Sequence, residues 1–308
     1  MSELRILVLA EEGAGGQALN AIARCGHKVV AVMTSAGESN SVAAAAHRYG
    51  YDIWPASDIT DLKVADRIRS ERVDLLFNVH SRHIIKEPIL QAARIGSFNM
   101  HPGPLPEYAG LNCVSWAIYR GVKSYGVTLH WMTRIIDAGA VAYRHDFPIE
   151  DNDTPVSLTH KCVKFGVPLI LKLIDVASQD PSTIPSMPQD LTRREYFDSR
   201  IPEGGRLSWN RRAGEIVDFV RACDYAPFYS PWGLPKASCE NREIFIVKAD
   251  RTHQKCDVHP GVVGRCDPDG TLIATADEWV SIRQLKIDGQ SVKPYTALKS
   301  GLVLQDGV

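Results

Sequence analysis

Short apolar runs alternate with helix-like segments along the first part of this 308-residue chain. Three runs, Arg5–Ala10, Val29–Met33 and Val73–Val79, are almost entirely apolar, as in strands that are covered on both faces. Segments with helical composition lie between them, at 17–24, 41–49 and 61–71. This β–α–β order predicts an α/β fold with a Rossmann-like, mostly parallel sheet and helices on both faces.

The composition of the chain changes near residue 180. A long helix is expected over about 154–176, because Thr154-Pro155 supplies a cap and a first-turn proline. Prolines and serines follow, as in a linker. Beyond residue 205, short alternating segments between Gly and Asp turns predict a small, open β-barrel. We therefore expect an α/β domain over 1–180, a linker over 181–204 and a β-barrel-like domain over 205–308.

Composition and charge limit the class of protein. With 44% hydrophobic residues, 23% charged residues and a formal net charge of -1, the chain resembles an ordinary soluble protein, and no nucleic-acid partner is expected. Neither a membrane span nor a signal-peptide pattern is visible, so we expect a cytoplasmic protein. The seven cysteines are scattered without a metal-ligand spacing, which favours reduced thiols and no metal.

Glycines follow the first apolar run in the sequence EEGAGG, residues 11–16. This spacing lacks the third glycine of a dinucleotide-binding fingerprint, and the two acidic residues would repel a pyrophosphate. We therefore expect these glycines to form a tight turn before a helix.

The sequence SFNMHPGPLP, residues 97–106, predicts a buried strand that breaks into a proline-stiffened loop. Asn99 and His101 are two apart, so their side chains emerge on one face of that strand. An amide can donate to an oxyanion, and an imidazole can move a proton near neutral pH. The segment 125–132 predicts a further strand, on which His130 is expected to pack, and the turn after it could bring Asp137 to the same place.

Residues 97–110, 126–130 and 137–139 together resemble the formyltransferase superfamily that uses 10-formyltetrahydrofolate. Its members include methionyl-tRNA formyltransferase, the sugar N-formyltransferases and glycinamide ribonucleotide formyltransferase. The family has an Asn-x-His pair, a Ser-Leu-Leu-Pro-like loop and a later Asp, and the matching positions here are Asn99, His101 and Asp137. The loop departs from the pattern, because Gly-Pro-Leu-Pro stands at 103–106.

Residues 206–209 and 216–223 resemble the start of the C-terminal domain of methionyl-tRNA and aminoarabinose-type formyltransferases, an open barrel of the oligonucleotide-binding type. The resemblance implies formyl transfer from 10-formyltetrahydrofolate, with Asn99, His101 and Asp137 as catalytic residues. It also implies that two loops and a turn wall the folate slot, with the contacting residues Arg82, His83, Ile84, Pro104, Leu105, Ile135 and Ile136.

The acceptor is not specified by these motifs. Residues 205–308 hold 14 Lys and Arg against 13 Asp and Glu, a poor platform for tRNA. We therefore expect a small-molecule amine acceptor, with a nucleotide-linked amino sugar as the leading candidate. A methionyl-tRNA formyltransferase, a 10-formyltetrahydrofolate hydrolase and a catalytically silent folate-binding module are the alternatives. A homodimer is compatible with the sequence, which does not determine the oligomeric state.

Overall fold

The computed structural model describes residues 2–35, 40–240 and 242–307, and it divides into two compact units. The first unit comprises residues 1–111, 124–147 and 159–197. The second comprises residues 112–123, 148–158 and 198–308.

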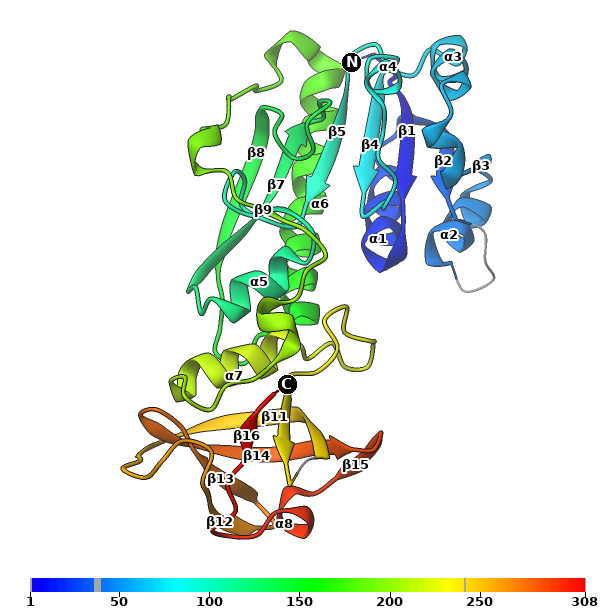
Figure 1. Ribbon diagram of the computed structural model, residues 1–308. Coiled ribbons are helices and arrows are strands. Elements are labelled where there is room, and N and C mark those ends of the chain that lie inside the picture. Colours follow the sequence, from blue (N-terminus) through cyan, green and yellow to red (C-terminus); the bar gives the residue numbers. More distant parts are fainter. Residues whose placement is uncertain (1, 36–39, 241, 308) are drawn as a thin grey trace. The chain divides into compact units, whose positions relative to one another are not determined.

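The first unit is organised around a seven-stranded sheet with the order β3-β2-β1-β4-β5-β7-β8 (Figure 1). The pairs β2–β3, β1–β2, β1–β4 and β4–β5 are parallel, whereas β7 runs antiparallel to β5. This confirms the expected Rossmann-like, mostly parallel sheet. Its strands are β1 (Arg5–Ala10), β2 (Lys28–Thr34), β3 (Ile53–Pro55), β4 (Leu75–Val79), β5 (Gly96–His101), β7 (Ser124–Trp131) and β8 (Val141–Pro148).

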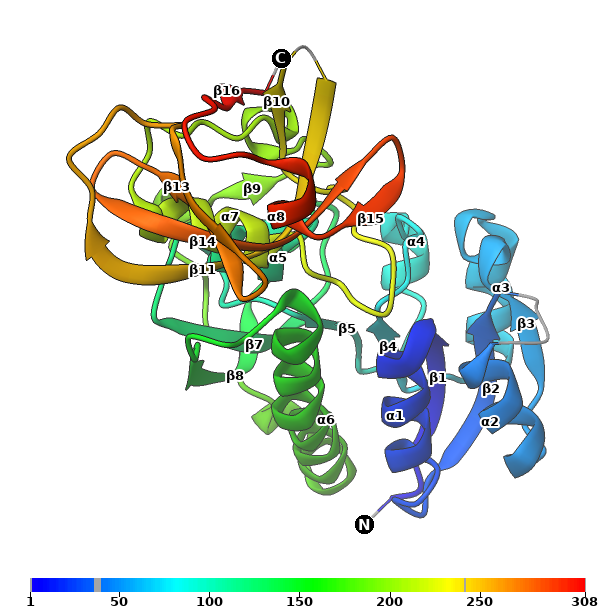
Figure 2. The ribbon, with the colours of Figure 1, turned by 90° about the horizontal axis from the view of Figure 1, so that it is seen from below.

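Helices cover both faces of this sheet (Figure 2). On one side lie α1 (Glu12–Ile22), α2 (Ser41–Tyr49) and α6 (Pro155–Gln179), and on the other lie α3 (Lys63–Ser70) and α4 (Glu87–Leu90). Alternate residues of β1 serve the two faces, because Leu7 and Leu9 pack in one core cluster with Ile68 of α3 and Ile89 of α4. Short 3₁₀ turns lie at Ala56–Thr60, Pro181–Thr183, Leu191–Arg193 and Pro202–Gly205.

The glycines after β1 do not form the expected tight turn. Helix α1 already begins at Glu12, so all of them lie in its first turns. A Cβ on Gly15 would lie 2.8 Å from the Cβ of Ala10, and one on Gly16 would lie 3.2 Å from Ser41 Oγ. The expectation was wrong because Gly15 and Gly16 allow close packing of α1 against β1 and α2.

The segment that we expected to be a linker contains ordered structure paired with the first unit. Strand β9 (Tyr196–Phe197) lies parallel to β6 (Ala109–Gly110) in a two-stranded sheet. Upstream, Met187 exchanges two backbone hydrogen bonds with Val141 at the start of β8. Residues up to 197 therefore belong to the first unit.

The second unit contains an antiparallel sheet with the strand path β12-β13-β14-β11-β10-β16, to which β15 adds beside β14. This arrangement confirms the expected β-domain of the open-barrel kind. Its core gathers Trp209, Ile216 of α7 and Ile282 of β14. The strands are β10 (Lys236–Cys239), β11 (Arg242–Lys255), β12 (Val263–Asp267), β13 (Gly270–Ala274), β14 (Glu278–Ile287), β15 (Gln290–Val292) and β16 (Gln305–Asp306).

The second unit also contains the helices α5 (Cys113–Tyr119), α7 (Ala213–Ala222) and α8 (Pro294–Ala297). Helix α5 joins this unit although it lies within the range 1–180 that we expected to be one domain. The Tyr119 ring meets Phe219 edge-on, and the Tyr119 hydroxyl accepts a hydrogen bond from Arg211 at 2.7 Å. Across the described residues, every helix is too short or too polar to cross a membrane.

Candidate active site

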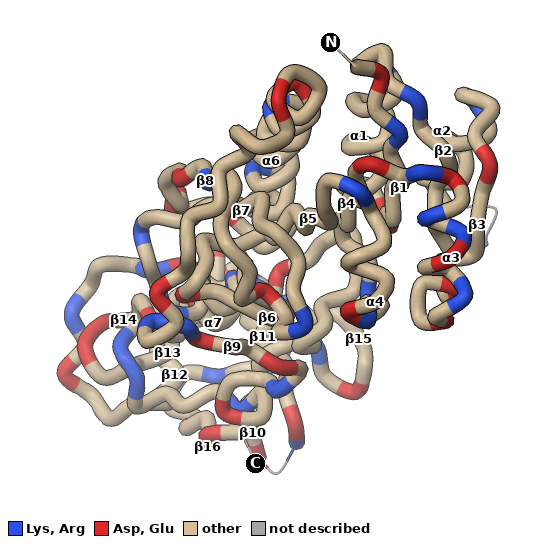
Figure 3. Tube along the Cα trace, turned by 90° about the horizontal axis from the view of Figure 1, so that it is seen from above, with Lys and Arg blue, Asp and Glu red and all other residues tan. Residues whose placement is uncertain are grey.

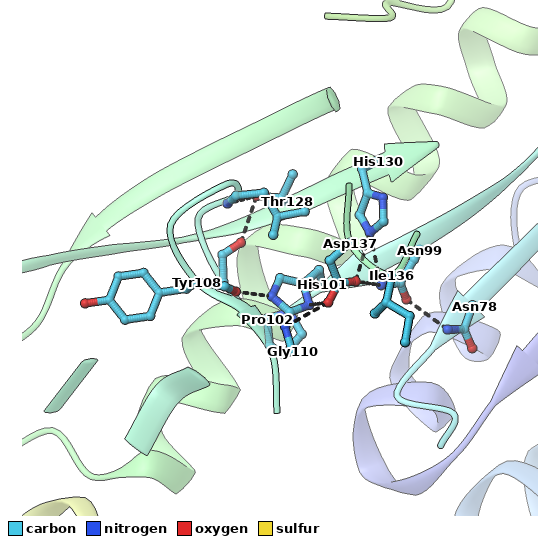
Figure 4. Close-up of polar contacts among 12 residues, drawn as sticks. Asn78, Asn99, His101, Pro102, Tyr108, Gly110, Thr128, His130, Ile136 and Asp137 are labelled. Carbon is cyan, nitrogen blue, oxygen red and sulfur yellow. Dashed lines mark hydrogen bonds and ion pairs between the residues drawn. The ribbon is translucent and has the colours of Figure 1, made fainter. Parts of the chain in front are cut away.

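Strand β5 presents Asn99 and His101 on the same face of the sheet, at its carboxyl end (Figure 4). His101 is the last residue of the strand and is buried, whereas Asn99 is partly exposed. The neighbouring strand β7 runs antiparallel, so that Asn99 lies directly opposite His130. The pair Asn99 and His101, which the local sequence predicts, is therefore joined by His130 from a strand that is distant in sequence.

The turn after β7 brings Asp137 to these side chains. Its Oδ2 atom lies 3.6 Å from His101 Nδ1, and its Oδ1 atom lies 3.4 Å from Asn99 Nδ2. The backbone N–H of Gly110 donates to Oδ2 at 2.9 Å. Asp137 has a φ of +55°, a conformation that non-glycine residues rarely adopt. The three residues that the motif singled out are therefore neighbours in space, although 38 positions separate Asn99 from Asp137.

Opposing effects set the charge states of this pair. Burial raises the pKa of Asp137, but His101, His130 and the Gly110 N–H outweigh it and hold that pKa below its ordinary value. Burial also dominates at His101, where it lowers the pKa below 6.5 although Asp137 and the Tyr108 carbonyl raise it. The resting site therefore holds an ionised carboxylate beside a largely neutral imidazole.

The tautomer of His101 follows from its partner. Nε2 lies 2.5 Å from the backbone oxygen of Tyr108, and a carbonyl oxygen can only accept, so Nε2 carries the proton. Nδ1 is then the basic nitrogen, and its 3.6 Å separation from Asp137 is longer than a hydrogen bond. A Cβ on Gly103 would lie 2.8 Å from both His101 Nε2 and the Tyr108 oxygen, so glycine suits this position of the loop.

Two residues that sequence reasoning did not assign to the site orient Asn99. Asn78 on β4 donates to Asn99 Oδ1 at 3.0 Å, which turns the Asn99 amide nitrogen toward His130 and Asp137. His130 was expected to pack, yet its Nε2 lies 3.2 Å from Asn99 Nδ2 and 3.4 Å from Asp137 Oδ1. His130 Nδ1 donates to the Trp131 carbonyl at 2.8 Å, so Nε2 is the accepting nitrogen.

Asn78 could have been recognised as a candidate site residue from the sequence, because it is a polar residue inside the mostly apolar run 73–79. No comparable signal existed for His130, because the pairing of β5 with β7 cannot be read from either strand alone.

The loop after His101 is fastened from β7 and β8. The Thr128 hydroxyl donates to the Gly103 carbonyl at 2.7 Å and accepts from the Leu105 N–H at 3.1 Å. Arg144 donates to the Leu105 carbonyl at 3.0 Å. Pro104 and Leu105, which we expected at the folate slot, are both buried. The backbone groups of Leu105 are therefore already engaged within the protein.

The loop after β4 carries three further expected residues. The Arg82 side chain is 88% exposed, and its guanidinium donates to Glu12 at 2.9 Å. Ile84 is 68% exposed, whereas His83 is partly buried. Glu12 also lies 3.6 Å from His80 Nδ1. This loop is therefore held from the start of α1 while it leaves an isoleucine in solvent.

The Asp137 turn also exposes apolar side chains. Ile135 is 53% exposed and Ile136 is 40% exposed, although isoleucine normally lies inside proteins. Together with Ile84, they are apolar surface in loops that border the candidate site. Within the described part of the chain, no cluster of three or more His, Cys, Asp and Glu side chains has metal-binding geometry.

Comparison with known proteins identifies the family. The formyl transferase model matches residues 5–174, and the model of the formyl transferase C-terminal domain matches residues 201–301. The chain belongs to the formyl transferase family. It is 26% identical over 272 residues to the bifunctional polymyxin resistance protein ArnA of Wigglesworthia glossinidia brevipalpis, covering 86% of this chain but 40% of that relative.

Two solved structures share the fold at low sequence identity. An N-formyltransferase from Helicobacter canadensis, in complex with folinic acid and dTDP-3-aminofucose, has a TM-score of 0.70 and 19% identity, and covers 91% of this chain and 98% of that one. The sugar 3N-formyl transferase WlaRD, in the presence of dTDP and 5-N-formyl-THF, has a TM-score of 0.70 and 18% identity, with 94% and 100% coverage. Both similarities extend over both units of the present chain.

Proposed function

We propose that this protein transfers a formyl group from 10-formyltetrahydrofolate to the amine of a small acceptor, in the first place a nucleotide-linked amino sugar. The convergence of Asn99, His101 and Asp137 carries this proposal. Family membership supports the reaction, and the two sugar N-formyltransferases of similar fold support the acceptor class.

Asn99 is suited to stabilise the formyl oxygen as negative charge builds on it. Its amide nitrogen has two hydrogens, one directed to His130 at 3.2 Å and the other to Asp137 at a longer 3.4 Å. The longer contact is the weaker, so this hydrogen can turn to a substrate oxygen. Asn78 keeps the amide in the orientation that this role requires.

His101 is suited to move the proton that the attacking amine gives up. Its neutral form offers Nδ1 as the base, because Nε2 is bound to the Tyr108 carbonyl. The imidazolium that results would lie beside the Asp137 carboxylate, which stabilises it. The leaving folate nitrogen then takes up a proton. Asp137 can also attract the ammonium form of the acceptor.

The residues at the site fit a folate as formyl donor. Asn78 Oδ1 and His80 Nε2, in and directly after β4, are buried polar atoms that have no hydrogen-bond partner among the described residues. A polar heterocycle can satisfy such atoms. The apolar side chains of Ile84, Ile135 and Ile136 suit the faces of a flat ring. We therefore propose that Arg82, His83, Ile84, Ile135 and Ile136 flank the donor, which supplies the formyl group. Pro104 and Leu105 would support the slot from inside.

The charge of the second unit supports a small acceptor over tRNA. Basic and acidic positions are interspersed along its strands (Figure 3). Binding of tRNA depends on neutralising many phosphates with Lys and Arg, and a balanced surface does this poorly.

The decisive experiment incubates the protein and 10-formyltetrahydrofolate with a panel of nucleotide-linked 3-amino and 4-amino sugars. The expected result is the gain of one CO by an acceptor, seen by mass spectrometry, with equal release of tetrahydrofolate. Tetrahydrofolate release without any amine would instead identify a hydrolase. Absence of release with every acceptor, initiator tRNA included, would overturn the proposal in favour of a silent binding module.

A further inference from the structure

The segment 189–194 fastens both loops of the candidate active site. Gln189 Nε2 donates to two carbonyl oxygens of the Asp137 turn, that of Asp137 at 2.9 Å and that of Gly139 at 2.6 Å. Arg194 donates to the carbonyl of Ile136 at 2.9 Å. Two side chains from one short segment thus hold three carbonyl groups at positions 136, 137 and 139.

The same segment also reaches the loop that follows His101. Arg193 forms an ion pair with Glu107, whose second oxygen lies 3.8 Å from Arg144 Nη1. Directly after the segment, the backbone N–H of Glu195 donates to the Pro106 carbonyl at 3.3 Å. The loop behind His101 and the turn that carries Asp137 are therefore tied to one piece of chain.

The Asp137 turn needs such support. Asp137 has a φ of +55°, which costs free energy for a residue with a Cβ. Its neighbours Ile135 and Ile136 are exposed and supply little buried surface to anchor the turn. Backbone conformations of this kind persist when the surrounding structure over-determines them.

We propose that residues 189–194 form a positioning strap for the active site, in which Gln189 and Arg194 hold the Asp137 carboxylate within reach of Asn99 and His101. The proposal rests on the proposed function, because it assigns the strap to formyl transfer. Gln189 and Arg194 bind backbone groups, so they act through Asp137 and are positioning residues.

The test replaces Gln189 by methionine, which keeps the length of the side chain and removes both donors. Gln179→Met is the matched control, because the side-chain amide of Gln179, at the end of α6, donates to Asp175 of the same helix. We expect the kcat of Gln189→Met to fall about 10- to 100-fold, as a displacement near 1 Å can cause, while Gln179→Met stays near wild type. If Gln189→Met unfolds, Arg194→Met tests the same turn.

A double-mutant cycle separates positioning from general support. If Gln189 acts through Asp137, adding Gln189→Met to Asp137→Asn should change kcat less than about twofold. An unchanged kcat in the single variant, or full additivity in the double variant, would overturn the proposal.

Titration of the His101 ring by NMR tests the strap without any acceptor. Burial lowers the pKa of His101 most strongly, Asp137 and the Tyr108 carbonyl raise it, and the neighbouring His130 and His80 lower it further. Displacing Asp137 should therefore lower the pKa of His101 in Gln189→Met, in the same direction as in Asp137→Asn. An unchanged titration would overturn the strap even if the wild type transfers formyl groups. If the titration shifts in Gln189→Met but the wild-type protein transfers no formyl group, only the proposed function is overturned.

Discussion

At the scale of single residues, the proposed mechanism assigns charge stabilisation and proton transfer to different side chains. Asn99 offers an amide hydrogen, His101 a basic nitrogen and Asp137 a fixed negative charge. Each group is also held by a neighbour, respectively Asn78, the Tyr108 carbonyl and the Gly110 N–H. Polar groups that are oriented in advance are effective because they need little rearrangement during the reaction.

Substitution of each of the three residues should therefore be costly. We expect Asn99→Ala, His101→Ala and Asp137→Ala each to lower kcat on the order of 10²–10³-fold or more, with thermal unfolding that stays cooperative. Steady-state kinetics with the acceptor found by mass spectrometry measure the loss. Near-normal transfer by His101→Ala would contradict the mechanism.

The pH dependence should report His101. Its pKa is lowered from 6.5 by burial, so the neutral imidazole persists below that pH and the acid limb of kcat/KM should lie below pH 6.5. Asp137→Asn removes a charge that raises this pKa, so the limb should move further toward acid. A limb that moves toward alkaline pH in this variant would show that another group titrates.

At the scale of secondary-structure elements, two adjacent carboxylates directly after β1, those of Glu11 and Glu12, bind residues at or just after the ends of the neighbouring strands β2 and β4. Glu11 accepts from the Ser35 N–H at 2.8 Å and from the Thr34 hydroxyl at 3.2 Å, both at the end of β2. Glu12 contacts His80 and Arg82, after β4. The strand order changes direction at β1, and ligands of open α/β sheets bind at such switch points.

The Glu12 contacts should appear in the pH dependence of stability. The neighbouring side chains of His80 and Arg82 lower the pKa of Glu12 from 4.5 to about 2, although burial opposes them. Because the folded-state pKa is depressed, the stabilisation is present above pH 4.5 and is lost as pH falls toward about 2.

Urea unfolding of Glu12→Gln measures this contribution. Glu12 is half exposed, so we expect a loss of a few tenths to about 1 kcal/mol at pH 7, smaller at pH about 3.5. Glu3→Gln, at an exposed position near the N-terminus, is the control. A loss that grows toward acid would contradict the assignment.

At the scale of the whole molecule, the balanced charge of the second unit bears on the choice between a small acceptor and tRNA. We expect bulk tRNA to bind weakly, with a shallow dependence of log affinity on log salt, because few phosphates can be neutralised by the balanced charge of residues 205–308. Fluorescence anisotropy at low and physiological salt measures this slope. Tight binding with a steep slope would restore the tRNA formyltransferase alternative.

Much of the fold followed from local patterns. The strands β1, β2 and β4 and the helix α6 lie close to the expected positions, since apolar periodicity reflects burial directly. The start of α1 was missed, because glycine is a turn signal in sequence but here permits close packing on Ala10 and Ser41. The segment 181–204 was taken for a linker, because proline and serine content does not reveal side chains that bind a distant turn.

The sequence by itself determined the class of fold, the near-neutral charge and the pair Asn99 and His101, because two residues on one strand share a face whatever surrounds them. It also marked Asp137 through resemblance to a family. Only the tertiary structure decided that His130 joins this cluster and that Gln189 and Arg194 hold the Asp137 turn. Those contacts join segments 31 to 58 positions apart, and no local pattern of residues encodes pairings over such distances.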